Sequence, residues 1–338
     1  MSAATETEVP VEFAQALREL GLAGADAIVG TPLTGGVSSD IWLIQTAQAP
    51  VCAKRALAKL RVAADWRAPI ERNLYEARWM RVANEAHPGC APRVLGQHPA
   101  LGVLVMNYLP PSRYSLWKQL LREGHADAST AREVGRVLGM IHSHSARRPE
   151  LAAEFDTDKI FFDIRLEPYL LATARKHPDL ASRLEHLVDA TRSHRVALVH
   201  GDVSPKNILI GPHAPVFLDA ECAWWGDPAF DLAFCLNHLL LKCLWTPAAT
   251  PAFLASFDAL AEAYLQVVDW EPSAALEQRA AALLPGLLLA RIDGKSPVEY
   301  VTEERQRELV RRVASALLQH PVASLHSVRD RWAEEVER

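Results

Sequence analysis

The sequence is poor in the features that mark several specialised classes of protein. Its five cysteines form no C-x-x-C pair, which argues against a disulfide scaffold or a zinc module. Lysine and arginine do not outnumber the acidic residues, and the net charge of −5 argues against a nucleic-acid-binding protein. The longest apolar run, residues 280–290, contains Pro285 and Gly286 and is too short for a membrane span, which needs about 20 residues.

The remaining composition is that of an ordinary globular protein. Hydrophobic residues make up 49% of the 338 residues, which is enough for one large core or two joined cores. The N-terminal residues are acidic and lack the apolar segment of a signal peptide. We therefore expect a cytoplasmic protein that binds neither nucleic acid nor membranes. The sequence carries no signal for the oligomeric state.

The most informative stretch is residues 198–221, LVHGDVSPKNILIGPHAPVFLDAE. Residues 196–199, 208–210 and 216–218 each form a short apolar run that predicts a buried strand. Asp202, Asn207 and Asp219 follow or precede these runs, so we expect them at strand ends, on loops held by a rigid platform. In kinases this layout lets one Asp orient a substrate hydroxyl, while the Asn and the other Asp hold Mg²⁺.

The order of four elements makes this pattern specific. His200-Gly201-Asp202 is followed by Asn207 at the fifth position, then by Asp219-Ala220-Glu221, and then by the run GDPAFD at residues 226–231. The stretch resembles the aminoglycoside phosphotransferase and choline kinase family, a branch of the protein-kinase-like superfamily.

The resemblance implies a role for each residue. Asp202 would be the catalytic base, Asn207 and Asp219 would hold Mg²⁺, and Asp231 would be a buried carboxylate that binds amides of the catalytic loop. ATP would be the phosphate donor, with GTP as a possible substitute, and a small-molecule hydroxyl would be the acceptor. Lys206 lies inside the loop, where it could contact the γ-phosphate or solvent.

A glycine- and serine-rich turn lies near the N-terminus, within residues 33–42. Its residues fit either a plain hairpin or a loop whose amides and hydroxyls bind phosphate. The next apolar segment, residues 51–55, alternates in polarity and carries Lys54, as the V-A-x-K strand of kinases does. The resemblance favours the phosphate loop, and the predicted nucleotide contacts in this half of the chain are Gly35, Gly36, Ser38, Ser39 and Lys54.

The segment 70–80 has the apolar spacing of a helix, and Glu76 flanks its apolar stripe. Glu76 is therefore our candidate partner for Lys54, with Glu71 as the alternative. A surface ion pair between Arg72 and Glu76, four residues apart, is the competing interpretation.

Residues 101–111 read as the last strand of a first lobe running into a linker. In the family that the chain resembles, the backbone of this linker binds the adenine edge. The resemblance therefore implies nucleotide contacts from Met106 and Tyr108, although Met106 also fits an ordinary core position.

The acceptor site is less well defined. Glu221 could approach a second metal ion or the substrate, or be structural. A cationic acceptor would need carboxylates or aromatic rings such as Trp224, whereas an acceptor with a phosphate or carboxylate would need Arg291 and Lys295. Amino sugars, amino alcohols, sugars and antibiotic-like alcohols all remain open.

We therefore expect an α+β protein of the protein-kinase-like two-lobed fold. A small antiparallel-sheet lobe would cover residues 1–106, a hinge residues 107–111, and a mainly helical lobe residues 112–338. The expected activity is ATP- and Mg-dependent phosphotransfer to a small-molecule hydroxyl. The alternatives are an inactive kinase-like nucleotide-binding module and a protein kinase, although the chain lacks the D-F-G and A-P-E motifs of the latter.

Overall fold

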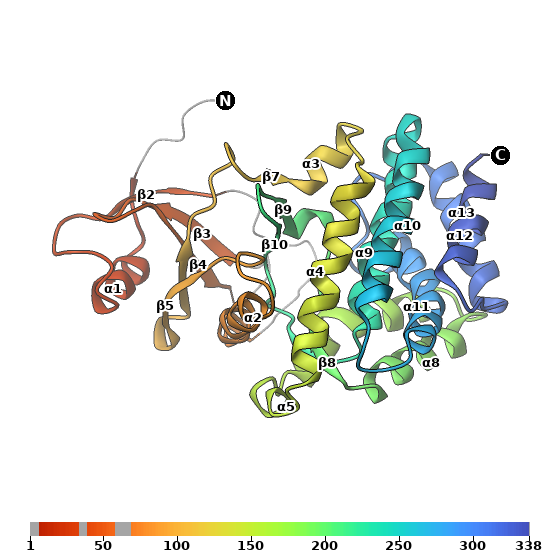
Figure 1. The fold of residues 1–338 in the computed structure, drawn as a ribbon, viewed down its shortest axis with the longest axis horizontal. Helices are drawn as coiled ribbons and strands as arrows, with labels where there is room; N and C mark the ends of the chain where they lie inside the picture. Colours follow the sequence, from red (N-terminus) through yellow and green to blue (C-terminus); the bar gives the residue numbers. More distant parts are fainter. Residues whose placement is uncertain (1–6, 34–38, 58–68, 338) are drawn as a thin grey trace.

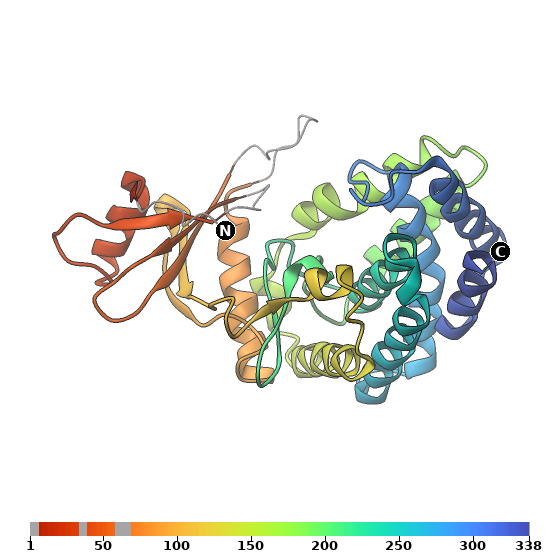
Figure 2. The same cartoon turned by 90° about the horizontal axis from the view of Figure 1, so that it is seen from above.

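A computed structural model of the chain describes residues 7–33, 39–57 and 69–337. It has two lobes, with a sheet at one end of the molecule and a larger set of helices at the other (Figures 1 and 2). The described strands of the first lobe form a single antiparallel sheet in the order β1-β2-β3-β4-β6-β5. Its strands are β1 (Thr7–Glu8), β2 (Val29–Pro32), β3 (Ser39–Ile44), β4 (Val51–Ala56), β5 (Val94–His98) and β6 (Val103–Asn107).

Two helices accompany this sheet. Helix α1 (Val11–Glu19) has an amphipathic pattern and buries Phe13 and Leu17 in a small core with Ile44 and Val105. Helix α2 (Arg72–Ala86) lies between the sheet and the second lobe, and its buried residues Trp79 and Met80 belong to the main core (Figure 1). The two lobes therefore share a continuous core through α2.

The second lobe is mainly helical, with three short strand pairings around the catalytic stretch. Strand β9 pairs with both β10 and β7, and β8 pairs with β11. The strands are β7 (Ser115–Leu116), β8 (Ala197–Val199), β9 (Ile208–Ile210), β10 (Pro215–Phe217) and β11 (Trp224–Gly226). The helices are α3 (Trp117–Arg122), α4 (Ala128–Ala146), α5 (Leu151–Glu154), α6 (Asp158–Phe161), α7 (Ala172–Ala174), α8 (Ala181–Ser193), α9 (Ala229–Trp245), α10 (Thr250–Val267), α11 (Ser273–Asp293), α12 (Glu304–Gln319) and α13 (Leu325–Val336).

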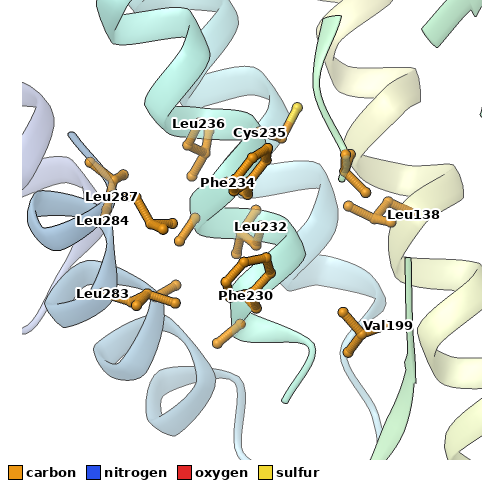
Figure 3. Packing of buried hydrophobic residues seen from close by; sticks show 14 of the residues in the cluster. Leu138, Val199, Phe230, Leu232, Phe234, Cys235, Leu236, Leu283, Leu284 and Leu287 are labelled. Carbon is orange, nitrogen blue, oxygen red and sulfur yellow. The ribbon is translucent and has the colours of Figure 1, made fainter. Parts of the chain in front are cut away.

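Helix α9 is the centre of this lobe. Every residue of it from Ala229 to Leu244 is buried, which explains why its sequence is apolar on all sides. Figure 3 shows leucines of α11 on one side of α9, and Leu138 of α4 with Val199 of β8 on the other. The few polar residues on α9 are thus held in an apolar setting, so each of them needs a partner or a function.

Helix α11 contains the apolar run that the sequence places at residues 280–290. Pro285 lies inside this helix without ending it. A Cβ on Gly286 would stand only 2.9 Å from Cδ1 of Leu187, so the missing side chain allows α11 to pack closely against α8. Within the described residues, no helix is both long enough and apolar enough to cross a membrane.

The sequence-based expectations for this architecture are largely confirmed. The antiparallel-sheet lobe and the helical lobe both form, and the three strands around the catalytic stretch lie within about a residue of their predicted limits. Strand β11 and the π-helical segment Phe162–Leu171 were not expected. The pairing of β11 with β8 is long-range in sequence, and no local pattern announces it.

Candidate active site

Lys54 on β4 lies between two carboxylates, one of them buried and the other partly exposed. Its ammonium pairs with the Glu76 carboxylate of α2 at 2.8 Å and also with the Asp219 carboxylate. Lys54 is 3% exposed and Glu76 is 1% exposed, so both are removed from water. The Lys54 ammonium group therefore links three parts of the chain, namely the sheet, α2 and the segment that follows β10.

Two carboxylates thus share this single ammonium group. Burial alone would lower the pKa of Lys54, but the Asp219 and Glu76 carboxylates raise it well above its ordinary value. Burial raises the pKa of Glu76 to about 7, although Lys54 opposes the shift. Burial would likewise raise the pKa of Asp219, but Lys54 and Lys206 hold it well below its ordinary value. Asp219 is therefore the carboxylate that stays ionised.

Asp219 is the one described non-glycine residue with positive φ, at 64°. This left-handed conformation costs free energy for a residue with a Cβ, and such residues concentrate at functional sites. Its backbone also follows directly on Leu218, whose amide donates to the Asn207 carbonyl at 2.8 Å. This bond keeps the two predicted metal ligands, Asn207 and Asp219, on neighbouring stretches of chain.

The orientation of the Asn207 side chain is fixed by one hydrogen bond. Its amide nitrogen donates to the Asp202 carbonyl at 3.0 Å. The amide oxygen has no hydrogen bond within the described part of the chain and is the atom that can bind a cation. Among the described residues, no group of three or more His, Cys, Asp or Glu side chains is arranged to hold a metal ion.

The carboxylate of Asp202 is held by two cations. Its Oδ2 lies 2.9 Å from Nη2 of Arg165 and 3.1 Å from Nζ of Lys206. Burial would raise the pKa of Asp202, but Arg165 and Lys206 lower it below its ordinary value. Both contacts use Oδ2, so Oδ1 remains without a bonded partner in the described part of the chain and could accept a hydrogen bond from a substrate hydroxyl.

Arg165 is the residue that the sequence analysis missed. It lies in the π-helical segment Phe162–Leu171, is 6% exposed, and donates from Nε to the Gly201 carbonyl. π-Helical turns often occur at functional sites because they change the direction of a side chain. The available signal was an isolated Arg in the apolar run Phe161-Phe162-Asp163-Ile164-Arg165-Leu166, which reads locally as an ordinary amphipathic helix.

The backbone of the catalytic loop is supported by Asp231 of α9. Its two carboxylate oxygens accept from the amides of His200 at 2.7 Å and Gly201 at 2.8 Å. Asp231 also contacts Nε2 of His142 at 3.2 Å, and His142 contacts the Tyr264 hydroxyl. Gly201 has φ of 81°, and a Cβ there would stand 2.7 Å from the Cys222 carbonyl oxygen, so only glycine fits this turn.

His200 is bonded within the loop and not to a charged partner. Its Nδ1 accepts from the Asp202 amide at 3.1 Å, and its Nε2 lies 3.0 Å from the Leu218 carbonyl. These contacts require a neutral ring with the proton on Nε2. Burial lowers the pKa of His200 in agreement with this state.

Glu221 pairs with a buried arginine, which is not the contact expected of a substrate-binding residue. Its Oε2 accepts from Nε of Arg72 at 2.9 Å, and both side chains are buried. Arg72 also donates to the carbonyls of Pro69 and Leu57, each at 2.8 Å. These contacts favour the structural role among the three that the sequence left open for Glu221.

The nucleotide contacts that the resemblance implies can be located only in part. Gly35, Gly36 and Ser38 lie outside the described residues. Ser39 begins β3 and is 2% exposed, and its hydroxyl lacks a hydrogen-bond partner in the described part of the chain. Met106 is 6% exposed on β6, where it pairs with Cys52 of β4, and Tyr108 follows the strand at its end.

The candidate acceptor residues do not come together as one group. Trp224 is buried, stacks on Phe161 at 4.3 Å and donates from Nε1 to Asp158. Lys295 is half-exposed and pairs with Glu167 at 2.7 Å on the surface. Arg291 is different, because it is 7% exposed and contacts Tyr169 and Ser296 at the end of α11.

Solved structures resemble this fold along almost the whole chain. An amicoumacin kinase in complex with AMP-PNP, Ca²⁺ and Ami aligns with a TM-score of 0.56 at 13% identity, covering 92% of this chain and 95% of that one. An ethanolamine kinase of Plasmodium vivax aligns with a TM-score of 0.54 at 14% identity, covering 89% of this chain and 83% of that one. Both support the protein-kinase-like fold that the sequence predicted.

The sequence also matches curated proteins over part of its length. A methylthioribose kinase of Cronobacter sakazakii (strain ATCC BAA-894) is 27% identical, covering 58% of this chain and 55% of that protein. The chain therefore spans about half the length of the curated relatives that it matches. The sequence model of the phosphotransferase enzyme family matches residues 29–242, which include Lys54, Asp202 and Asp219. By this match, the chain belongs to the phosphotransferase enzyme family.

Proposed function

We propose that this protein is a small-molecule kinase that transfers the γ-phosphate of ATP to a hydroxyl group, with Mg²⁺ as the metal. One observation carries the proposal. Lys54 pairs with Glu76 and Asp219, the neighbouring Leu218 amide bonds to the Asn207 carbonyl, and the Asn207 side chain bonds to the Asp202 carbonyl, so these contacts connect the Lys54 set to the residue that carries the Asp202 carboxylate. A phosphoryl donor and a hydroxyl acceptor need these two sets at adjoining positions.

The donor atoms of these residues are chemically suited to bind a nucleotide and a metal ion. Asp219 and the oxygen of Asn207 are hard ligands of the kind Mg²⁺ takes, one or two at a time, together with phosphate oxygens. Lys54 would donate to phosphate oxygens once these compete for its ammonium, and Glu76 would keep it in position. When bound, the nucleotide supplies the phosphoryl group and the metal offsets its charge.

Asp202 would hold the acceptor hydroxyl and take its proton. A base of lowered pKa is adequate here, because a loose transition state for phosphoryl transfer depends mainly on the orientation of the hydroxyl. Arg165 and Lys206 would fix the carboxylate by holding Oδ2 while Oδ1 faces the substrate. Asp231 would act through the loop amides and not on the substrate.

ADP release from ATP and Mg²⁺ tests the proposal across a panel of small alcohols. The panel should span aminoglycosides, choline, ethanolamine, methylthioribose, simple sugars, macrolides and hydroxy acids, with GTP as a second donor. A signal that disappears in Asp202→Asn supports a small-molecule kinase. Phosphorylation of casein or histone would instead favour a protein kinase, although only ten positions separate Asp219 from the start of α9 at Ala229, too few for an activation segment.

The inactive binding module is distinguished by the same experiment. Binding of Mg-ATP, followed by thermal shift, with no ADP production for any acceptor would favour that alternative. Absence of both nucleotide binding and turnover would remove the kinase proposal altogether.

A further inference from the structure

The polar residues on the far half of α9 form a cationic cluster. His238 and Lys242 are four residues apart and therefore share a helix face. Arg291, at the end of α11, belongs to the same cluster because its charge acts on His238 and Lys242, and Tyr300, in the segment after α11, belongs to it because its ring lies against the Lys242 ammonium group. We define the cationic cluster as His238, Lys242, Arg291 and Tyr300.

Lys242 is the most unusual member of the cluster. It is 1% exposed, and its Nζ lies 3.9 Å from the centroid of Trp245 and 3.7 Å from that of Tyr300. No carboxylate or carbonyl within the described ranges bonds to its ammonium. Burial, with the charge of Lys118 adding to it, lowers the pKa of Lys242 to about 6. A buried amine without a partner opposes folding, so its presence calls for a reason outside the fold.

The other members also carry unused hydrogen-bonding atoms. Nε of Arg291, Nε2 of His238 and the hydroxyl of Tyr300 are buried and have no hydrogen-bond partner among the described residues. Nη1 of Arg291 donates to neutral oxygens of Tyr169 and Ser296. Arg291 pairs with no described carboxylate. Several donors concentrated in one place are therefore left without an acceptor.

The cluster adjoins the catalytic loop. Lys206 and Lys118 both act on the charge state of His238. Helix α3, which carries Lys118, packs against α9 and against residues 205–207. Arg165, which holds Asp202, lies 5.8 Å from the ring centroid of Tyr169, and the Tyr169 hydroxyl accepts from Arg291 at 3.1 Å. A chain of direct contacts thus joins the Asp202 carboxylate to the cluster.

The balance of charge around the cluster is positive. Glu299 is paired with Lys118, and Asp202 already has two cations. Arg291 remains as a cation with no described carboxylate partner, and the Lys242 amine, whose lowered pKa leaves it largely neutral at pH 7, would take up a proton beside a bound anion. This setting repels a cationic amino sugar or amino alcohol and attracts an anion.

We propose that the acceptor carries an oxyanion group, a carboxylate or a phosphate, and that Lys242 and Arg291 bind this group while Asp202 holds the hydroxyl. The inference rests on the proposed function for the hydroxyl end of the acceptor, and on the cluster alone for the oxyanion end. Charge-assisted hydrogen bonds from an ammonium and a guanidinium would give the oxyanion both affinity and orientation. Tyr300 and His238 would complete the set of donors.

Matched pairs of alcohols test the inference directly. Glycerate is compared with its neutral counterpart glycerol. Glucuronate and glucose 6-phosphate are each compared with glucose. Choline and kanamycin serve as cationic compounds. Calorimetric titration measures binding to the wild-type protein, Lys242→Met and Lys176→Met, and ADP release measures turnover. Lys176 is exposed, so Lys176→Met makes the same chemical change on the surface and outside the buried cluster.

The expected result is tighter binding of an acidic alcohol than of its neutral partner, and loss of about 10- to 100-fold in that affinity in Lys242→Met but not in Lys176→Met. Carboxylate and phosphate arms tell which oxyanion is preferred. Equal binding of all acidic compounds by the wild type and Lys242→Met, or a preference for choline or kanamycin, would overturn the inference. Tyr300→Phe is a second test variant, because it removes one unpartnered hydroxyl and no charge. It should weaken the binding of the acidic alcohol severalfold.

The two proposals fail in different ways. If acidic alcohols bind in a Lys242-dependent manner but are never phosphorylated, the oxyanion site stands and the phosphotransfer proposal falls. If a neutral or cationic alcohol is phosphorylated with an efficiency that Lys242→Met does not change, the kinase stands and the oxyanion site falls.

Discussion

Replacing Lys242 by Met should stabilise the protein, because the native side chain opposes folding. Burial lowers the pKa of this amine to about 6, whereas a lysine in the unfolded chain titrates near its ordinary value of about 10.4. At pH 7 the unfolded state therefore binds one more proton than the folded state. Each pKa unit corresponds to about 1.4 kcal/mol, so the difference at pH 7 amounts to roughly 5 kcal/mol of lost stability.

One effect reduces the net gain. The rings of Trp245 and Tyr300 stabilise the protonated form of the amine by about 2 kcal/mol when the contact is desolvated, which offsets part of the cost of burying it. Met fills nearly the same volume and adapts well to irregular packing, so no cavity is expected. We expect Lys242→Met to raise the free energy of unfolding at pH 7 by about 2–3 kcal/mol.

The pH dependence identifies the cause. A depressed lysine pKa makes wild-type stability rise with pH between about 6 and 10, because the unfolded state binds more protons there. Lys242→Met lacks this contribution, so its advantage should shrink by about 1.4 kcal/mol for each pH unit. The other charged and titratable groups around Lys242 are Lys118, Glu299, Arg291, His238 and Tyr300, and they are common to both proteins.

Urea denaturation of the wild type, Lys242→Met and Lys176→Met at pH 7, 8 and 9 measures these differences. Lys176→Met, on the surface, should show no stability difference that varies with pH. A Lys242→Met protein that is less stable than the wild type at pH 7, or whose difference does not change with pH, would refute the reasoning. It would mean that the folded protein holds Lys242 as a satisfied ammonium.

Three further predictions concern the catalytic loop and the core. Asp202→Asn should lower phosphotransfer by about 10²- to 10⁴-fold in steady-state ADP release with little change in the far-UV circular dichroism spectrum, since the Asn oxygen can still accept from Arg165; a variant that keeps most of its activity would exclude Asp202 as the base. Lys54→Met should weaken Mg-ATP binding in calorimetric titration while leaving Glu76 buried without its cation, and unchanged nucleotide affinity would contradict the role given to Lys54. Asp231→Ala should cost about 1–3 kcal/mol in chemical denaturation, because the amides of His200 and Gly201 lose their acceptor; a smaller loss would show that water replaces the carboxylate.

The sequence by itself determined the fold class and the polar residues of the catalytic stretch. Short apolar runs of three residues, each with an Asp or Asn within three positions of one end, have few alternatives to strands that display those residues on loops. Glu76 could also be chosen, because the helical period of segment 70–80 puts it beside the apolar stripe, and it does pair with Lys54. The roles of these residues remain predictions that the kinetic experiments test.

Only the tertiary structure decided which charges meet. Arg165 is 37 positions before Asp202 in the chain and reaches it because a π-helical segment redirects its side chain, which no periodicity in the sequence encodes. Arg291 and Lys295 were equivalent in the sequence, yet one is buried beside Tyr169 and the other pairs with Glu167 on the surface. The sequence placed Lys242 on an apolar helix, but its isolation follows from α9, α11 and the segment after α11 packing around it. The free energy of a charge depends on its partners and its exposure to water, and both are set by contacts between residues far apart in the chain.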